Sequence, residues 1–391
     1  WRWKDWIDRR WMKKYHELPD MEDAIGNLSA SVLNPNDQDE LALLADHAMR
    51  CMGCGAKVPP DILSKVLQDL KPVLRDEVVT GIDGPDDAAL VTSPGQGLLV
   101  HTVDHLSAIV NDPYVFGKIA ATHALSDIFA MGAEPQTALA TLTVPHASPA
   151  KVEATVRELM TGAIEVLNAS NTSLVGGHTA EGAELSLGFS ITGHVAEDQV
   201  LHKHGMVTGD VLILTKPLGV GVLFAGDMRN KAKGRWIEAA MEMMLQSNQN
   251  AAQILQQHQA HACTDVTGFG LLGHLLEMCG PETRVELDLE NRPCLPGAID
   301  LAARNIYSSL YEPNKKHFEP QLKLASGSPS SKHPLLFDPQ TSGGLLAALP
   351  LSEVEPCLTA LWQAGYEHAM KIAWVTEANA SDSSVTVVSA V

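Results

Sequence analysis

From residue 49 to about residue 199, short apolar runs alternate with longer stretches in which apolar side chains recur at helical spacing. A short apolar run bounded by turn residues is typical of a buried strand, whereas a period of roughly 3.6 residues is typical of a helix. The pattern therefore predicts helices over residues 116–131 and 149–169, and strands over residues 97–103, 136–144, 172–175 and 185–195.

The same mixture resumes at about residue 200. A strand over residues 209–215 leads into a glycine-containing segment, helices are expected over residues 236–257 and 271–278, and strand-like segments lie near Leu345 and Val385. Strands and helices do not alternate strictly, which favours an α+β fold over a doubly wound sheet. A chain of 391 residues is too long for one ordinary core. We expect a tail and linker (1–48), an N-terminal domain (49–199) and a C-terminal α+β domain (200–391).

The first 16 residues differ from the rest because tryptophans and basic residues are concentrated there. Trp3, Ile7 and Trp11 follow an i, i+4, i+8 stripe, which predicts an amphipathic basic helix. Such a helix is suited to a membrane surface or to a partner domain. The alternative is that it is a fragment of something upstream. Residues 17–48 are interpreted as a linker that includes a short helix.

The composition and charge of the chain argue against several classes of protein. A hydrophobic content of 45% with 30 glycines and 5% aromatics is typical of a soluble protein packed with Ala, Leu and Val. No run approaches the length of a membrane span, no signal peptide is visible, and six unevenly spaced cysteines do not resemble a disulfide framework, so we expect the cytoplasm. A net charge of −19 argues against nucleic-acid binding. Because carboxylates repel phosphates, a nucleotide would have to bind through divalent cations.

The most reactive segment runs from Cys51 to Lys57. A nearby lysine raises the thiolate fraction of a cysteine, and the glycines on either side of Cys54 make that residue the better nucleophile candidate. Cys51 would then be an auxiliary thiol. A thioredoxin-like redox pair would need a preceding strand, and a zinc site would need a second ligand pair, neither of which the sequence offers. Two loop cysteines without a role remain the alternative.

Isolated aspartates form the second candidate group. The turn Gly84-Pro85-Asp86-Asp87 presents two carboxylates together, although an ordinary solvated turn has the same composition. Asp104 follows an apolar run. Asp127 lies inside an apolar helical stretch, where a carboxylate is costly to bury unless it is paired or bound to a metal.

Three glycine-rich segments complete the candidates. Gly176-Gly177-His178 is expected to follow a strand as a loop that contacts phosphate, or else to be a plain turn. Residues 268–273 have the spacing of a dinucleotide fingerprint, but no long buried strand precedes them, so we favour Asp265, just upstream, as the functional residue. Residues 338–344 suit either anion binding or domain closure.

These motifs, in this order, resemble those of the selenophosphate synthetases. The resemblance runs from about Cys51 to the C-terminus and rests on Cys54-Gly55-Ala56-Lys57, Gly84-Pro85-Asp86-Asp87, residues 121–132, Gly176-Gly177-His178, residues 215–221, residues 264–274 and residues 338–344. It implies a two-domain fold like that of aminoimidazole ribonucleotide synthetase, in which the N-terminal domains pair into a homodimer with ATP near the shared interface.

The resemblance also implies a reaction in which ATP, selenide and water give selenophosphate, AMP and phosphate. The implied catalytic residues are Cys54 and Lys57 on a mobile loop. The implied metal ligands for Mg²⁺ are Asp87, Asp127 and Asp265. The implied nucleotide contacts are Lys57, Gly84, Pro85, Asp86, Asp104, Asp127, Gly176, Gly177 and His178.

The sequence departs from the family pattern at Ala56, where many members carry a second cysteine. Cys51 is the one thiol nearby that could substitute for it. Residues 1–12 resemble the end of an NADH dehydrogenase-like flavoprotein domain that is fused upstream of this synthetase in some chains. The competing hypotheses are a sister ATP enzyme of the same fold and a non-catalytic selenium-carrying or redox module of a fused flavoprotein.

Overall fold

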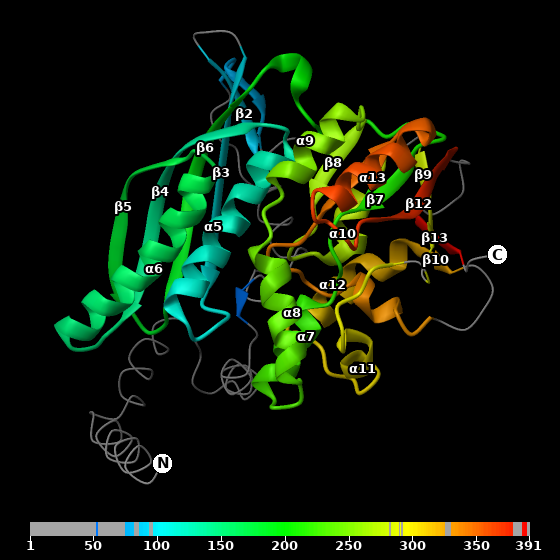
Figure 1. Cartoon of the computed structure of the whole chain (residues 1–391). Helices are drawn as coiled ribbons and strands as arrows, with labels where there is room; N and C mark the ends of the chain where they lie inside the picture. The colour runs from blue at the N-terminus through cyan, green and yellow to red at the C-terminus, as the bar shows by residue number, and fades with distance from the viewer. Residues whose placement is uncertain are drawn as a thin grey trace, which may run out of the picture. The chain divides into compact units, whose positions relative to one another are not determined.

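The computed structural model describes residues 52–53, 75–81, 86–93, 97–280, 283–288, 290, 292–324, 330–377 and 385–388. All of them belong to one compact unit of the chain. The tail and linker predicted over residues 1–48, with their predicted helices, lie outside the described residues. Within the unit the strands form two sheets, which Figure 1 shows on either side of helix α5.

The first sheet has six strands in the order β1-β2-β3-β6-β4-β5. Neighbouring strands are antiparallel except β4 and β5, which run parallel and are joined through helix α6. The strands are β1 (Val78–Thr80), β2 (Ala89–Thr92), β3 (Leu98–Ser107), β4 (Glu134–Pro145), β5 (Ser173–Gly182) and β6 (Ser186–Val195).

Helices α5 (Pro113–Ala130) and α6 (Pro149–Ala169) cover one face of this sheet. The two helices approach so closely that a Cβ atom added at Gly117 would lie 2.0 Å from the Leu159 carbonyl oxygen, and one added at Gly162 would lie 2.0 Å from the Tyr114 carbonyl oxygen. Only glycine permits that backbone contact. The side chain of Asp112 caps α5 by accepting a hydrogen bond from the Val115 amide.

The second sheet has seven strands in the order β10-β13-β9-β12-β7-β11-β8. They are β7 (Val211–Leu214), β8 (Ala262–Asp265), β9 (Thr283–Asp288), β10 (Leu322–Leu324), β11 (Leu345–Leu349), β12 (Met370–Glu377) and β13 (Val385–Val388). The accompanying helices are α7 (Val220–Met228), α8 (Gly234–Leu245), α9 (Gln249–Gln257), α10 (Gly270–Met278), α11 (Ala298–Ala302), α12 (Tyr311–Phe318) and α13 (Val354–Gln363).

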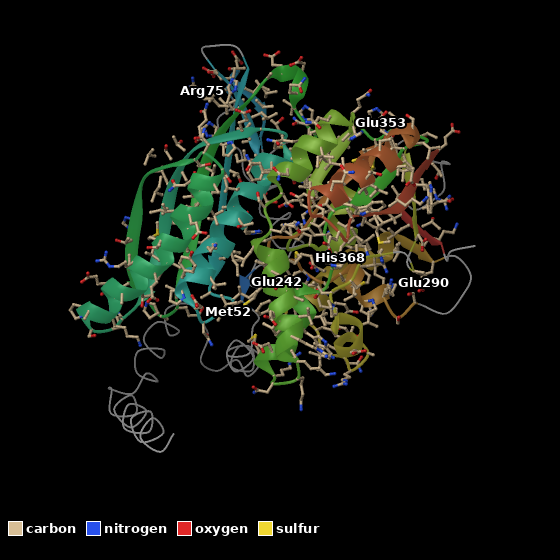
Figure 2. All side chains as sticks on the ribbon, viewed as in Figure 1. Met52, Arg75, Glu242, Glu290, Glu353 and His368 are labelled. Atoms are coloured by element: carbon tan, nitrogen blue, oxygen red, sulfur yellow. The ribbon has the colours of Figure 1, made fainter. Side chains whose placement is uncertain are left out.

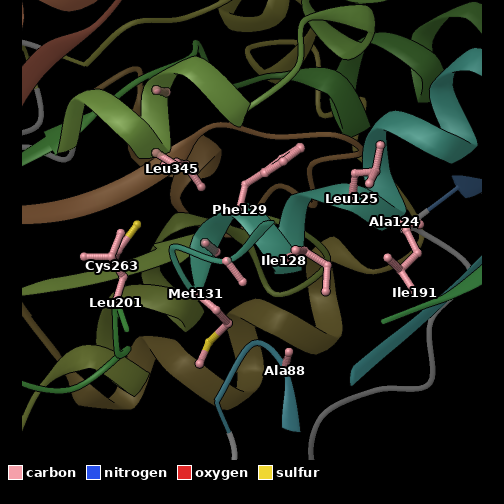
Figure 3. Packing of buried hydrophobic residues seen from close by; sticks show 14 of the residues in the cluster. Ala88, Ala124, Leu125, Ile128, Phe129, Met131, Ile191, Leu201, Cys263 and Leu345 are labelled. Atoms are coloured by element: carbon pink, nitrogen blue, oxygen red, sulfur yellow. The ribbon is translucent and has the colours of Figure 1, made fainter. Parts of the chain in front are cut away.

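Helix α5 joins the two halves of the core. Its buried residues lie all around its axis, which is the pattern of a helix enclosed by other elements. Figure 3 shows Ile128 and Phe129 of α5 in one apolar cluster with Ile191 of β6 and Leu345 of β11. Burying a large apolar side chain stabilises a fold by about 2 kcal/mol, so this shared cluster couples the first sheet to the second.

The predicted α+β, two-domain architecture is confirmed, with corrections in detail. The single helix expected over residues 236–257 is wrong: α8 ends at Leu245 and α9 begins at Gln249. Asp104 lies inside β3 and not after it, because β3 continues along β6 as far as Ser107. Among the described helices, none is long and apolar enough to cross a membrane.

Candidate active site

Four of the predicted aspartates meet between the two sheets. Asp87 precedes β2, Asp104 lies in β3, Asp127 lies in α5, and Asp265 ends β8. Burial raises the pKa of Asp127 well above its usual value, and the neighbouring negative charges of Asp104, Asp265 and Asp87 raise it further. The structure therefore brings together carboxylates from both domains, close enough for the charges of the other three to raise the pKa of Asp127.

The alternation of side chains along β3 explains how two of these groups reach α5. Residues two apart share a face of a strand, so Thr102 and Asp104 both point to the side that carries the helix. The Thr102 hydroxyl donates a hydrogen bond to Asp127 Oδ2. Asp104 Oδ2 lies 3.5 Å from Nε2 of His123, which is one helical turn before Asp127 on α5.

The ring of His123 is fully buried, and its orientation is set by the second domain. Nδ1 of His123 accepts a hydrogen bond from the Ser342 backbone amide at 3.3 Å. Since Nδ1 is the acceptor, the proton of the neutral ring lies on Nε2, where it faces Asp104. The turn of the C-terminal domain that contains Ser342 thus orients the His123 ring towards Asp104 in the N-terminal domain.

Asp87 is held by both domains. Its Oδ1 accepts a hydrogen bond from the Thr264 hydroxyl at 2.8 Å and lies 2.9 Å from the ammonium group of Lys203. Its Oδ2 is buried and, among the described residues, has no hydrogen-bond donor. Burial raises the pKa of Asp87 to about 7, against the opposing effect of Lys203 and with the support of Asp265.

Asp86 anchors the turn that presents Asp87. Both of its carboxylate oxygens accept from the Lys203 backbone amide at 3.2 Å, and Oδ1 also accepts from the Asp87 amide. Burial alone would raise the pKa of Asp86, but the hydrogen bonds from His202 and these amides outweigh it, so the pKa is lowered. Asp86 is therefore the ionised, fully engaged member of the pair.

Residues 338–344 form the contact between the domains. The Ser342 amide donates to His123 Nδ1 and the Ser342 hydroxyl donates to the Ile119 carbonyl, both on α5 of the N-terminal domain. The Gly343 carbonyl accepts from Asn248, which also bonds to the Ser126 hydroxyl of α5. These contacts agree with the predicted role of residues 338–344 in domain closure, and anion binding by this segment stays a prediction.

The same segment borders the predicted catalytic loop. A Cβ atom added at Gly53 would lie 2.7 Å from Thr341 Oγ1, so the residue just before Cys54 packs against this turn. Met52, labelled in Figure 2, is partly buried. Cys51, Cys54, Ala56 and Lys57, and also Gly84 and Pro85, lie outside the described residues.

The loop predicted at residues 176–178 is wrong, because Gly176, Gly177 and His178 lie within β5. They pair in parallel with residues 139–141 of β4. A Cβ atom added at Gly177 would lie 2.2 Å from the Ala140 carbonyl oxygen, so close strand packing accounts for this glycine. Because β6 and β4 separate β5 from β3, these residues are roughly 14 Å from the Asp104 strand and do not join the carboxylates within one chain.

Cavities lined by described residues also lie away from the carboxylates. One of about 260 Å³ is bordered by the C-terminal end of α5 and by α9, and one of about 400 Å³ is lined by residues that include Glu242 and His368, both labelled in Figure 2. Neither is lined by a predicted site residue. The carboxylate cluster is therefore the candidate site.

Comparison with known proteins agrees with the motifs. Residues 85–195 match the family model described as AIR synthase related protein, N-terminal domain, and residues 207–385 match its C-terminal domain. The selenide, water dikinase of Carboxydothermus hydrogenoformans is 36% identical over 315 residues, which cover 81% of this chain and 91% of that protein. The chain belongs to the selenide, water dikinase family. The Pelobacter propionicus member is 36% identical over 332 residues, covering 83% of this chain and 93% of its own.

Solved structures share the fold of this family member at low identity. Thiamine-monophosphate kinase from Stenotrophomonas maltophilia has a TM-score of 0.58 at 20% identity, covering 85% of this chain and 96% of its own. Hydrogenase maturation protein HypE in complex with ATP has a TM-score of 0.59 at 14% identity, covering 84% and 91%. These likenesses support the two-domain AIR synthase-like architecture.

Sequence reasoning missed two residues at the site, His123 and Lys203. His123 carries a usable signal, because it precedes Asp127 by four residues and so shares its helix face. Lys203 carries none, since its side-chain partners come from distant parts of the chain.

Proposed function

We propose that the chain catalyses the selenide, water dikinase reaction, in which ATP, selenide and water give selenophosphate, AMP and phosphate. The observation that carries this proposal is the convergence of Asp87, Asp104, Asp127 and Asp265 in a chain that matches most of the length of selenide, water dikinases. A sequence-wide match supports the reaction, and the carboxylates supply the acidic site that its nucleotide requires.

The carboxylates suit Mg²⁺ shared with a nucleotide better than a protein-only metal cage. Asp87 Oδ2 is a buried oxygen with no donor among the described residues, and the cluster is crowded with negative charge. Yet, within the part of the chain that the structure describes, no three His, Cys, Asp or Glu side chains converge closely enough to hold an ion. Mg²⁺ commonly takes one or two carboxylates and completes its shell with water and substrate phosphates.

In this proposal Asp87, Asp127 and Asp265 are the Mg²⁺ ligands, with one or two of them on any one ion, and the metal when bound would neutralise charge on the triphosphate. Asp104, oriented by His123, contacts the nucleotide, and the turn of Gly84, Pro85 and Asp86 lies along it. Cys54 delivers or shields selenide, and Lys57 steadies the transferring phosphoryl group. The packing of Gly53 against Thr341 supports a loop anchored beside the domain contact.

The proposal includes a homodimer formed by the N-terminal domains. The face of the first sheet opposite α5 and α6 exposes Val103 and Val175, at 67% and 60%, together with Leu139, and no described helix covers it. Exposed apolar side chains on an uncovered sheet face are typical of an interface. Gly176, Gly177 and His178 lie in β5 of the same sheet, so a second copy on this face would lie close to them.

Two further proposals rest on the sequence. The resemblance of residues 1–12 is the support for an upstream NADH dehydrogenase-like flavoprotein domain. Translating the coding sequence upstream of Trp1 tests this, and a different upstream domain would contradict it. The cysteine usage supports a cytoplasmic location, which fractionation of the source cells tests.

Phosphorus NMR of the products tests the reaction. With ATP, Mg²⁺ and selenide, we expect a selenophosphate signal from the unaltered chain and at least a hundredfold loss in Cys54→Ala, because the thiol handles selenide. Cys357→Ala is the matched control, since that buried thiol lies in α13, away from the carboxylates. Full activity of Cys54→Ala would remove Cys54 from the mechanism. Absence of selenophosphate from the unaltered chain would contradict the function itself.

A further inference from the structure

Lys203 is a buried cation among the carboxylates of the site. It lies in the segment between β6 and β7, and 6% of its surface is exposed. Its ammonium group is 2.9 Å from Asp87 Oδ1 and 3.1 Å from Glu277 Oε2 on α10. Its backbone amide donates to both oxygens of Asp86. The side chain is thus held between the two domains by ion pairs at its tip and by hydrogen bonds at its base.

The neighbourhood explains why a lysine is tolerated there. Burial by itself lowers the pKa of Lys203, but Asp87 and Glu277 outweigh burial and raise it, so the side chain is a cation throughout the physiological range. A buried carboxylate without a counter-charge is strongly destabilising. Lys203 supplies that counter-charge to Asp87.

The two oxygens of Asp87 have different surroundings. Oδ1 is engaged by Lys203 and Thr264, whereas Oδ2 is buried and has no donor among the described residues. A divalent ion on Asp87 would therefore lie close to an ammonium group that binds the same carboxylate. Two like charges at that range repel each other strongly in a poorly solvated site.

Glu277 gives the ammonium group a second anchor. It lies at the rim of the site, with 36% of its side chain exposed. When a divalent ion takes Asp87, Lys203 keeps Glu277 as its partner and remains a paired cation. The site can therefore exchange one positive charge for another without leaving either Lys203 or Asp87 unpaired.

We propose that Lys203 is an internal counter-cation of the metal site, a positioning residue that neutralises Asp87 while no metal is bound and makes metal binding depend on the phosphates of a bound nucleotide. This inference rests on the proposed function. By repelling a divalent ion from the protein alone, Lys203 keeps the metal affinity of the free protein low. The nucleotide phosphates supply the extra negative charge that overcomes this repulsion.

Binding of Mn²⁺, followed by electron paramagnetic resonance of the free ion at pH 8.5, tests the proposal without any turnover. In the absence of nucleotide, we expect Lys203→Met to bind Mn²⁺ at least tenfold more tightly than the unaltered chain. Lys203→Arg, which keeps the charge, should stay within threefold of it. Lys231→Met removes one charge from an exposed position and should leave the affinity unchanged. If Lys203→Met does not fold, Lys203→Gln is compared in its place.

The outcomes separate this inference from the function on which it rests. Equal or weaker Mn²⁺ binding by Lys203→Met would overturn the role of Lys203. A loss of metal-free binding of a non-hydrolysable ATP analogue in that variant would also overturn it, because Lys203 would then be a phosphate ligand. Failure of the unaltered chain to bind Mn²⁺ even with the analogue present would instead contradict the proposed metal-bound nucleotide site.

Discussion

Replacing Asp87 with asparagine should change how the stability of the metal-free protein depends on pH. The side chain is 4% exposed, and its pKa rises from the usual value near 4 to about 7, chiefly because of burial. Between these two values the unfolded chain holds Asp87 ionised while the folded chain holds it protonated. The folded state therefore loses stability as the pH rises from about 4 to about 7, and the loss is constant above that window.

The size of the change in the free energy of unfolding follows from the pKa shift of Asp87. From pH 5 to pH 7 the free energy of unfolding falls by about 1.4 kcal/mol per pH unit, or about 2.7 kcal/mol in all. A change of this size moves the Tm of a chain of this length by roughly 3 °C. Asp87→Asn lacks the titrating group, so its Tm relative to that of the unaltered chain should rise by about this amount between pH 5 and pH 8.

Differential scanning calorimetry in the presence of EDTA measures the effect. Comparing each variant with the unaltered chain at the same pH cancels the groups that both share. Asp198→Asn, which alters an exposed carboxylate, should show no such change. If the Tm difference between Asp87→Asn and the unaltered chain were the same at pH 5 and pH 8, the burial argument for Asp87 would be refuted.

Three other predictions concern the packing of α5 on α6, the orientation of Asp104 by His123, and the proposed dimer interface. Gly117→Ala places a Cβ atom 2.0 Å from the Leu159 carbonyl and should destabilise the protein by about 2 kcal/mol in urea unfolding, whereas Gly234→Ala, with open space around it, should be close to neutral. His123→Ala should raise the KM for ATP about tenfold with a smaller effect on kcat, because Asp104 loses its orienting partner. His123→Gln should recover part of the loss. An unchanged KM in initial-rate kinetics would contradict the orienting role of His123. Val103→Glu should halve the mass measured by sedimentation equilibrium and Leu351→Glu should not, and a monomeric unaltered chain would contradict the proposed dimer.

Features governed by local rules could be predicted from the sequence. The helix around Asp127 follows from its continuous apolar pattern, and the structure confirms that Asp127 lies inside it. The Gly-Pro dipeptide predicts a turn at Asp86 and Asp87, and the structure places both residues just before β2. Because the cost of burying a carboxylate is independent of the fold, Asp127 stood out without any knowledge of its partners.

The errors occur where tertiary contacts decide the outcome. The sequence predicts a loop at Gly176 and Gly177 because glycines are common in turns, but parallel pairing with β4 extends β5 through them. The break between α8 and α9 leaves the Gln246 carbonyl to accept a hydrogen bond from the buried Lys216, a contact that no local pattern encodes. Lys203 meets Glu277 from 74 residues away.

The central claim is that the carboxylate cluster serves a dikinase that consumes ATP in the presence of selenide. Chromatographic analysis of the nucleotide products, with and without selenide, tests it most directly. The account predicts AMP in equal amount to the selenophosphate formed, dependent on both selenide and Mg²⁺, and abolished in Asp265→Asn. ADP as the sole nucleotide product, or AMP formation that is indifferent to selenide, would contradict it.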